Sequence, residues 1–203
     1  MFNYMRHFKM GLMAMAMILA AVSCGTRGQK KNAAAEAPET KATEAVQEPE
    51  TYSQAIDRYL TEVIGAQYGS GEVCIPYHDY ISADESRQDD IQVWGSYWVD
   101  NYNVVGDTLM FVSGGSHPGK MHVKQDEAGH FTVTGFDAVG DGSAFLPTAK
   151  AIFGDRFEDF QTALSDQNHR EAVRKAAIAA YVEKHGLPVK VYKDYGWPAV
   201  EIR

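Results

Sequence analysis

The stretch IQVWGSYWVDNYNVV, residues 91–105, is rich in aromatic and β-branched residues and predicts one long strand. Side chains alternate between the two faces of a strand, so the stretch divides into two sets. The first set is Trp94, Ser96, Trp98, Asp100 and Tyr102, and the second is Val93, Gly95, Tyr97 and Val99. Because both sets are largely apolar, we expect a central strand that is covered on each side.

Four shorter segments around this strand are also predicted to be strands. They contain β-branched and aromatic residues and are separated by turn sequences such as Gly106-Asp107 and Pro118-Gly119. The four segments are residues 72–81, 108–116, 120–125 and 130–139. Short connections join neighbouring strands in antiparallel order, so we expect an antiparallel meander sheet of about five strands.

Helical patterns lie before and after the strands. Thr51 and Gln54 have the spacing of a capping box, and an apolar stripe at helical spacing follows as far as Gly65. The segments predicted to be helices after the strands are residues 145–153, 156–164 and 168–185, and a short strand is expected at 189–192. The sequence thus predicts an α+β fold with an N-terminal helix and with C-terminal helices packed on the sheet.

The composition is typical of a globular protein, because 45% of the 203 residues are apolar and 23% are charged. Acidic residues outnumber basic ones by 27 to 19, which gives a net charge of -8 at pH 7. Such a chain lacks the excess of basic residues that nucleic-acid binding uses, so we expect no nucleic-acid partner.

The N-terminus has the organisation of a secretory signal peptide. Arg6 and Lys9 precede an apolar run over residues 10–22, which is too short to span a membrane. The sequence AAVSC at residues 20–24 resembles the lipobox of bacterial lipoproteins, with Ala21 in place of the more common leucine. This resemblance implies that the chain is cut before Cys24 and that Cys24 is lipidated.

The chain is therefore expected to have three parts. Residues 1–23 are the lipoprotein signal peptide, residues 24–50 are the lipidated cysteine and a flexible tether, and residues 51–203 are a single α+β domain. The tether is poor in large apolar residues, so it cannot bury enough surface to fold. We expect a cell-envelope protein that a lipid anchor holds to a bacterial membrane. The expected location is the outer membrane, with the protein facing the periplasm.

A second resemblance is architectural. A leading helix, an antiparallel meander and packing helices over residues 51–192 are similar to the cystatin-like and NTF2-like folds. These folds occur in small bacterial lipoproteins of unknown function. The resemblance rests on the order of elements, so it implies no site residues for this chain.

Polar and aromatic side chains near the central strand are the candidates for binding a ligand. One face of that strand either packs as core or lines a concave pocket, which would be mostly apolar with a few polar groups. The candidate ligand-binding residues are Trp94, Trp98, Asp100, Tyr102, His117 and His122. The segment 192–198, with Tyr195 and Trp197, is expected to be either a lid on this pocket or a clamp on the core.

Other chemistry is less well supported by the sequence. If Pro118-Gly119 is a hairpin turn, His117 and His122 lie on the same face. A zinc site needs at least a third ligand. His130 or His78 would have to be brought there by the fold. Cys74 and His78 are too far apart along a strand for a direct thiol–imidazole hydrogen bond, so Cys74 is expected to be buried in the core. We therefore predict no metal and no cofactor.

These observations favour a lipid-anchored, non-catalytic binding module for a small molecule or a partner protein. The alternative is a small pocket enzyme, a hydrolase or isomerase, that uses His117, His122 or Asp100. A purely structural or assembly role, without a pocket, is the third possibility.

The lipid anchor yields a first testable prediction. Cys24→Ser is expected to release the protein from membranes into the soluble fraction, because each buried methylene of an acyl chain contributes about 0.8 kcal/mol to membrane binding. Cell fractionation and immunoblotting measure the distribution, with Cys74→Ser as the matched control that should stay in the membrane. Retention of the Cys24→Ser protein in the membrane fraction would refute the lipobox interpretation.

Overall fold

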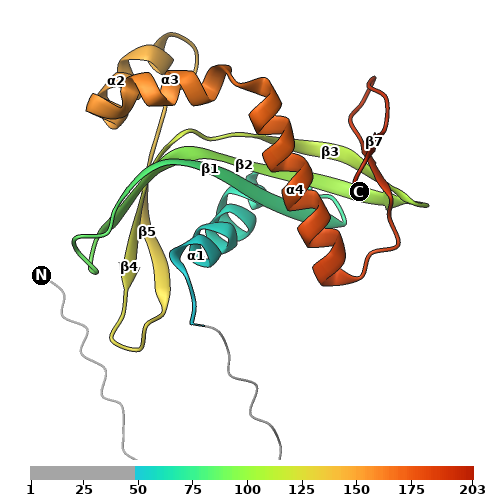
Figure 1. The fold of residues 1–203 in the computed structure, drawn as a ribbon, viewed down its shortest axis with the longest axis horizontal. Helices are drawn as coiled ribbons and strands as arrows, with labels where there is room; N and C mark the ends of the chain where they lie inside the picture. The colour runs from blue at the N-terminus through green and yellow to red at the C-terminus, as the bar shows by residue number, and fades with distance from the viewer. Residues whose placement is uncertain (1–48) are drawn as a thin grey trace, which may run out of the picture. The chain divides into compact units, whose positions relative to one another are not determined.

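The computed structural model describes residues 49–203, and the predicted signal peptide, Cys24 and the predicted tether up to residue 48 lie outside the described residues. The described chain is an α+β fold with a mostly antiparallel open sheet and C-terminal helices (Figure 1). Its helices are α1 (Tyr52–Tyr59), α2 (Phe145–Phe153), α3 (Phe157–Ser165) and α4 (Gln167–His185). Its strands are β1 (Val73–Asp84), β2 (Ile91–Val105), β3 (Thr108–Ser116), β4 (Gly119–Gln125), β5 (Phe131–Ala138), β6 (Val191–Lys193) and β7 (Val200–Glu201).

Strand β2 organises the sheet. β1 pairs antiparallel along one edge of β2, from Val73 opposite Tyr102 to Asp84 opposite Gln92. The other edge of β2 is shared by two strands, because β3 pairs with its C-terminal half and β4 with its N-terminal half. β5 then pairs with β4, β6 pairs parallel with β3, and β7 pairs with β6.

This topology corrects the expected meander of about five strands. The sheet has seven strands, and β3 and β4 run in line along β2 instead of folding back on each other. Between them the His117 N–H donates to the Tyr97 carbonyl at 2.7 Å, so pairing with β2 continues across the break. Pro118-Gly119 is therefore not a hairpin turn, which agrees with the poor fit of type II turns to the twist of a hairpin.

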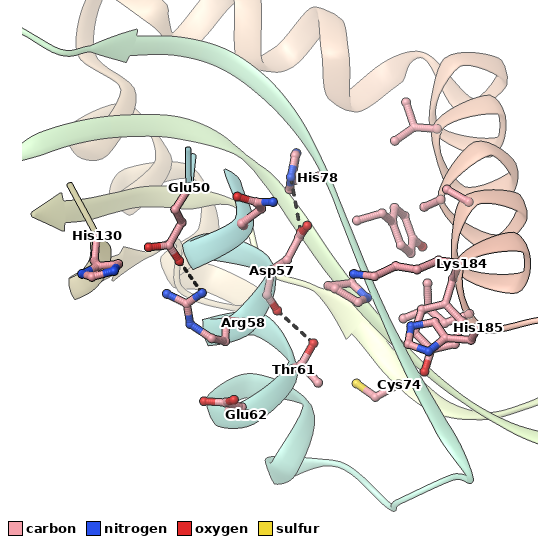
Figure 2. Close-up of a pocket in the computed structure, with 18 residues that line it drawn as sticks. Glu50, Asp57, Arg58, Thr61, Glu62, Cys74, His78, His130, Lys184 and His185 are labelled. Atoms are coloured by element: carbon pink, nitrogen blue, oxygen red, sulfur yellow. Dashed lines mark hydrogen bonds and ion pairs between the residues drawn. The ribbon is translucent and has the colours of Figure 1, made fainter. Parts of the chain in front are cut away.

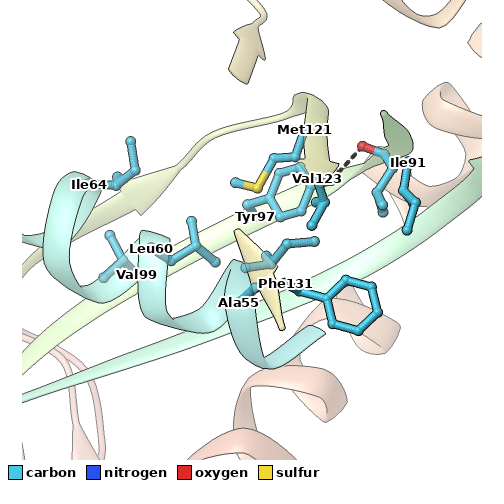
Figure 3. Close-up of a cluster of buried hydrophobic side chains, with 11 residues drawn as sticks. Ala55, Leu60, Ile64, Ile91, Tyr97, Val99, Met121, Val123 and Phe131 are labelled. Carbon is cyan, nitrogen blue, oxygen red and sulfur yellow. Dashed lines mark hydrogen bonds between the residues drawn. The ribbon is translucent and has the colours of Figure 1, made fainter. Parts of the chain in front are cut away.

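The prediction that β2 is covered on both faces is confirmed. All ten residues from Val93 to Tyr102 are buried. On one face, Tyr97 and Val99 pack with α1 residues such as Ile56 in the cluster drawn in Figure 3. The opposite face is covered by α4 at its Tyr102 end and by α2 and α3 at its Trp94 end.

The helices begin and end where local chemistry satisfies their backbone. α1 has the capping box formed by Thr51 and Gln54, and its last turn continues as a π-helical turn (Leu60–Ile64) and a 3-10 turn (Gly65–Gln67). Gly65 thus lies within the helical segment instead of ending it, and a Cβ there would lie 2.8 Å from the Cys74 sulfur. Gly186 ends α4 in the left-handed conformation that glycine accommodates.

The close approach of β5 to β4 gives a stability prediction. A Cβ at Gly119 would lie 2.3 Å from the Asp137 carbonyl oxygen, so Gly119→Ala is expected to lower the free energy of unfolding by about 1–3 kcal/mol. Urea unfolding followed by tryptophan fluorescence measures the change.

The matched control is Gly135→Ala on β5. A Cβ at Gly135 would meet only His122 atoms at 3.7 Å or more, which is ordinary contact, so we expect a change within about 0.5 kcal/mol. Equal stabilities of the two variants would contradict the packing explanation.

Candidate functional site

The guanidinium of Arg174 lies in the centre of a buried polar network. Arg174 extends from α4 and is 8% exposed. Its Nε donates to Asp100 Oδ2 at 2.9 Å, and its Nη1 and Nη2 each donate to an oxygen of Asp194 at 2.7 Å. Nη2 also donates to the Tyr102 hydroxyl at 2.9 Å. The network therefore joins α4 to β2 and to the residue that follows β6.

Asp100 is held by three donors. Besides Arg174, the hydroxyls of Tyr77 and Tyr102 donate to its Oδ2 at 3.2 and 3.1 Å. Burial raises the pKa of Asp100, and Arg174 and the two tyrosine hydroxyls oppose that rise. Burial and the charge of Asp100 raise the pKa of both tyrosines, so they act as neutral donors. With both aspartates ionised, the network carries one negative charge in excess.

A pocket of about 360 Å³ borders this network. Asp100, Arg174 and Asp194 contribute its polar wall. The aromatic part of the lining consists of Tyr77, Trp98, Phe111, Tyr195 and Trp197. Inside the pocket the ring of Trp98 is stacked on Tyr77, with centroids 5.2 Å apart and planes 7° apart. The pocket thus combines flat aromatic surfaces with charged hydrogen-bonding groups.

The two aromatic residues at the mouth are outside the core. Tyr195 is 93% exposed and Trp197 is 71% exposed. They lie on the hairpin between β6 and β7, which Arg174 holds through Asp194. This position excludes the role of a clamp on the core and leaves the side chains free to cover the pocket.

The structure brings together three of the six candidate residues. Trp98 and Asp100 line the pocket, and Tyr102 supports it through its hydrogen bonds to Asp100 and Arg174. Trp94 belongs to a separate cluster, where its Nε1 donates to the Ile152 carbonyl at 2.9 Å. The guanidinium of Arg156 lies over its ring, 4.0 Å from the centroid.

The two candidate histidines do not share a site. His117 lies beside Tyr68, whose hydroxyl is 2.8 Å from Nε2, and burial lowers the pKa of His117. His122 lies between two carboxylates, with Asp90 2.7 Å from Nδ1 and Asp137 3.2 Å from Nε2. Residues five apart along one extended line point to opposite faces of a sheet, so these histidines cannot bind one metal together.

Sequence reasoning missed Arg174 and Asp194. Arg174 stands four residues before Ile178 and eight before Val182, and all three are the buried residues of α4. The position of a basic residue among the apolar residues of a buried helix face therefore indicates a buried anionic partner. Asp194 had no comparable signal, since it lies between a short strand and an exposed turn.

A second, larger hollow runs along the outer edge of β1 between α1 and α4 (Figure 2). This groove has a volume of about 1070 Å³. Cys74 lies in its floor and is half-buried, not fully buried as expected. Burial, with the charge of Asp100, raises the pKa of the Cys74 thiol, which disfavours the nucleophilic thiolate. His78 is engaged elsewhere, by Asp57 at 3.4 Å and the Tyr80 hydroxyl at 3.2 Å.

Two features are absent from residues 49–203. No group of three or more His, Cys, Asp or Glu side chains in this part of the chain is arranged to hold a metal ion. No helix in the same part is long and apolar enough to cross a membrane.

Comparison with protein-family models, with curated proteins and with solved structures gave no significant match. The similarity to cystatin-like and NTF2-like folds therefore stays a prediction.

The Arg174 network makes a testable prediction about stability. Arg174→Leu leaves Asp100 buried without its cation, so the free energy of unfolding should fall by about 3–5 kcal/mol. The double variant with Asp100→Asn should recover part of that loss, since it removes the unpaired charge. Urea unfolding measures both variants.

Arg170→Leu is the control for this experiment. Arg170 lines the same pocket but has no ion pair within the described residues, so its loss should change stability by about 0.5 kcal/mol or less. A loss below about 1 kcal/mol for Arg174→Leu would show that the network does not hold the fold together.

Proposed function

We propose that the protein is a lipid-anchored binding module of a bacterial cell envelope that takes a small molecule in the pocket beside Arg174. The observation that carries the proposal is the position of Tyr195 and Trp197. These large aromatic side chains stand exposed at the mouth of a pocket that already has an aromatic and charged lining. Exposed aromatic groups that rim a pocket are typical of a binding surface.

The exposed position of these rings is built into the chain. Gly196 between them adopts φ 78°, which turns the hairpin, and the Trp197 N–H donates to the Asp194 carbonyl at 3.1 Å. Arg174 in turn fixes the Asp194 carboxylate with two hydrogen bonds. Since the base of the hairpin is held by a buried guanidinium, its tip stands at a fixed distance from the pocket, and little ordering is needed when a ligand binds.

The lining indicates the kind of ligand. The pocket is large enough for a small molecule, because ligand pockets begin at about 300 Å³. Asp100, Glu171 and Asp194 are opposed by only Arg170 and Arg174, so the ionised lining has a net charge of -1, from two positive and three negative groups. We therefore expect a neutral or cationic ligand with a flat face that stacks on an aromatic ring and with polar groups that reach the carboxylates.

Binding explains the geometry better than catalysis does. Oδ2 of Asp100 already accepts hydrogen bonds from three donors, so this oxygen is not a free base. His117 and His122 lie outside the lining of the pocket. The lipobox at Cys24 supports the envelope location, where a domain on a tether would present the pocket away from the membrane.

Mass spectrometry of the full chain tests this proposal. The protein is purified from membranes of its native host, and its native mass is compared with its denatured mass, so that covalent lipid cancels. We expect a reproducible excess mass from a noncovalent ligand. Trp197→Ala should lower the affinity for that ligand by at least about tenfold, because truncating an aromatic anchor costs about 1–2 kcal/mol or more.

Leu146→Ala serves as the matched control, since Leu146 is also a large apolar residue, 49% exposed, but lies on α2 outside this pocket. It should bind the ligand like the unmodified chain. An excess mass that Trp197→Ala leaves unchanged would place the ligand elsewhere, and no excess mass under native conditions would count against a small-molecule role.

A further inference from the structure

We propose that the free edge of β1 binds an extended peptide segment of a partner protein, in which basic side chains alternate with small apolar ones. This site is the groove between α1 and α4, separate from the mouth of the Arg174 pocket, and goes beyond the small-molecule function. The bound segment would add a strand to the sheet, as in other cases of recognition by strand addition.

The floor of the groove is the edge of the strand itself. Five consecutive residues of β1, residues 74–78, line the groove. Successive side chains of a strand point to opposite faces, so a cavity on one face would touch only alternate residues. A hollow that borders all five residues therefore lies along the edge of the strand. It has α1 on one side and α4 on the other (Figure 2).

The register of the sheet shows which backbone groups face the groove. The Tyr97 carbonyl accepts from His117, so the backbone of Tyr97 faces β3 and β4. The N–H and C=O groups of successive residues point to opposite edges of a strand, so those of Trp98 point to β1. The backbone groups of Tyr77, the partner of Trp98, point to β2. The backbone groups of the alternate residues therefore point outward into the groove. These residues are Cys74, Pro76 and His78.

This outward row is open to pairing. Within residues 49–203, no hydrogen bond satisfies the backbone of Cys74, Pro76 or His78 from the groove side. The three residues present three carbonyl acceptors but only two N–H donors, since proline has none. Pro76 thus removes one donor from the centre of the edge. This disfavours unspecific pairing of strands and leaves the opposite carbonyl of a bound segment without a donor from β1.

The opposite edge of the sheet, at β5, has side chains hydrogen-bonded to its backbone. On β5 the Phe131 N–H donates to Glu50 at 2.9 Å, and the Phe131 carbonyl accepts from Arg58 at 2.9 Å. Glu50 and Arg58 also pair with each other at 2.6 Å. Side chains thus take the place of a neighbouring strand at the first residue of β5, whereas the groove along β1 keeps space for a strand.

The two walls determine the side chains that a bound segment needs. On the α1 wall Arg58 pairs with Glu50, and Asp57 lies 3.4 Å from the His78 ring. Glu62 has no ion pair within residues 49–203, so this wall carries more negative than positive charge. The residues of the α4 wall are small or apolar over most of its length, and Lys184 and His185 follow at its end. The apolar members are Val173, Ala177, Ala180 and Tyr181.

Side chains of an added strand would alternate between these walls. Those that point to α1 would meet carboxylates and should be basic. Those that point to α4 would meet alanines and should be small and apolar, and Lys184 disfavours basic groups on this side. The net charge of -8 for the whole chain also attracts a basic segment.

Peptide binding to the full chain tests the proposal. The probe is a fluorescein-labelled heptapeptide of alternating lysine and valine, measured by fluorescence anisotropy against the chain in detergent micelles. We expect saturable binding, and no binding of the matching peptide of alternating glutamate and valine. Two further lysine peptides are methylated at alternate backbone nitrogens, one on the lysines and one on the valines, which removes the main-chain donors of one strand edge in each and keeps the side chains. The peptide whose methylated edge faces β1 should not bind, so one of the two should lose binding.

Two pairs of variants locate the binding site. Ala180→Trp fills the groove from α4 and should weaken binding at least about tenfold, whereas Ala176→Trp, on the same helix outside the groove lining, should leave it within about twofold. Glu62→Lys should weaken binding about two- to fivefold, as expected for an exposed ion pair. Its control is Glu158→Lys, an equal charge change on α3.

The result that overturns the proposal is equally definite. Absence of binding at millimolar peptide, or binding that Ala180→Trp and backbone methylation do not change, would show that the β1 edge is not a peptide site. A concentration-dependent dimer in light scattering that Ala180→Trp dissolves would identify a second copy of the chain as the occupant, and would also refute the partner segment.

Discussion

The positions of both hollows depend on the buried ion pairs that the Arg174 guanidinium makes with Asp100 and Asp194. A buried cation is costly unless charged partners surround it, and here Asp100 and Asp194 supply them from the centre of the sheet and from the C-terminal hairpin. Hydrophobic contacts of Ile178 and Val182 hold α4 against the sheet but are not directional. The hydrogen bonds of Arg174 are directional, so they set the rotation and axial position of α4 on β2. The hairpin that carries Tyr195 and Trp197 is fixed by the same group.

Because α4 is fixed in this way, its two sides have different roles. The side with Arg174 closes the base of the aromatic pocket, and the side with Ala177 and Ala180 forms one wall of the β1 groove. Tyr77 lies between them, since its side chain borders both hollows and also donates to Asp100. A rigid helix that separates two concave surfaces is a scaffold suited to binding, because neither surface must be assembled when its ligand arrives.

Much of the fold was predictable because it follows from side-chain alternation on one strand. The two faces of residues 93–102 were assigned from sequence, and both are buried as expected. The sheet topology was predicted less well, because the effect of Pro118-Gly119 depends on its surroundings. A proline can end a ladder or merely interrupt it, and only the register shows that β4 continues the line of β3 along β2. The strand expected at residues 189–192 overlaps β6, which is three residues long, whereas β7 has only two residues and is too short to leave a periodic pattern.

The candidate site was half predictable, and the reason lies in charge balance. Asp100 was placed correctly on a face of β2 that is covered, and a carboxylate in such a place requires a cation or several donors. Arg174, in step with Ile178 and Val182, required an anion on the surface that its helix covers. Each residue alone requires a partner of opposite charge that its own surroundings do not identify. Taken together, Asp100 and Arg174 are such partners, although 74 positions separate them in the sequence. Asp194 could not be found in this way, because an exposed turn places no demand on a carboxylate. It becomes necessary only when one aspartate proves too few for a guanidinium with five N–H donors.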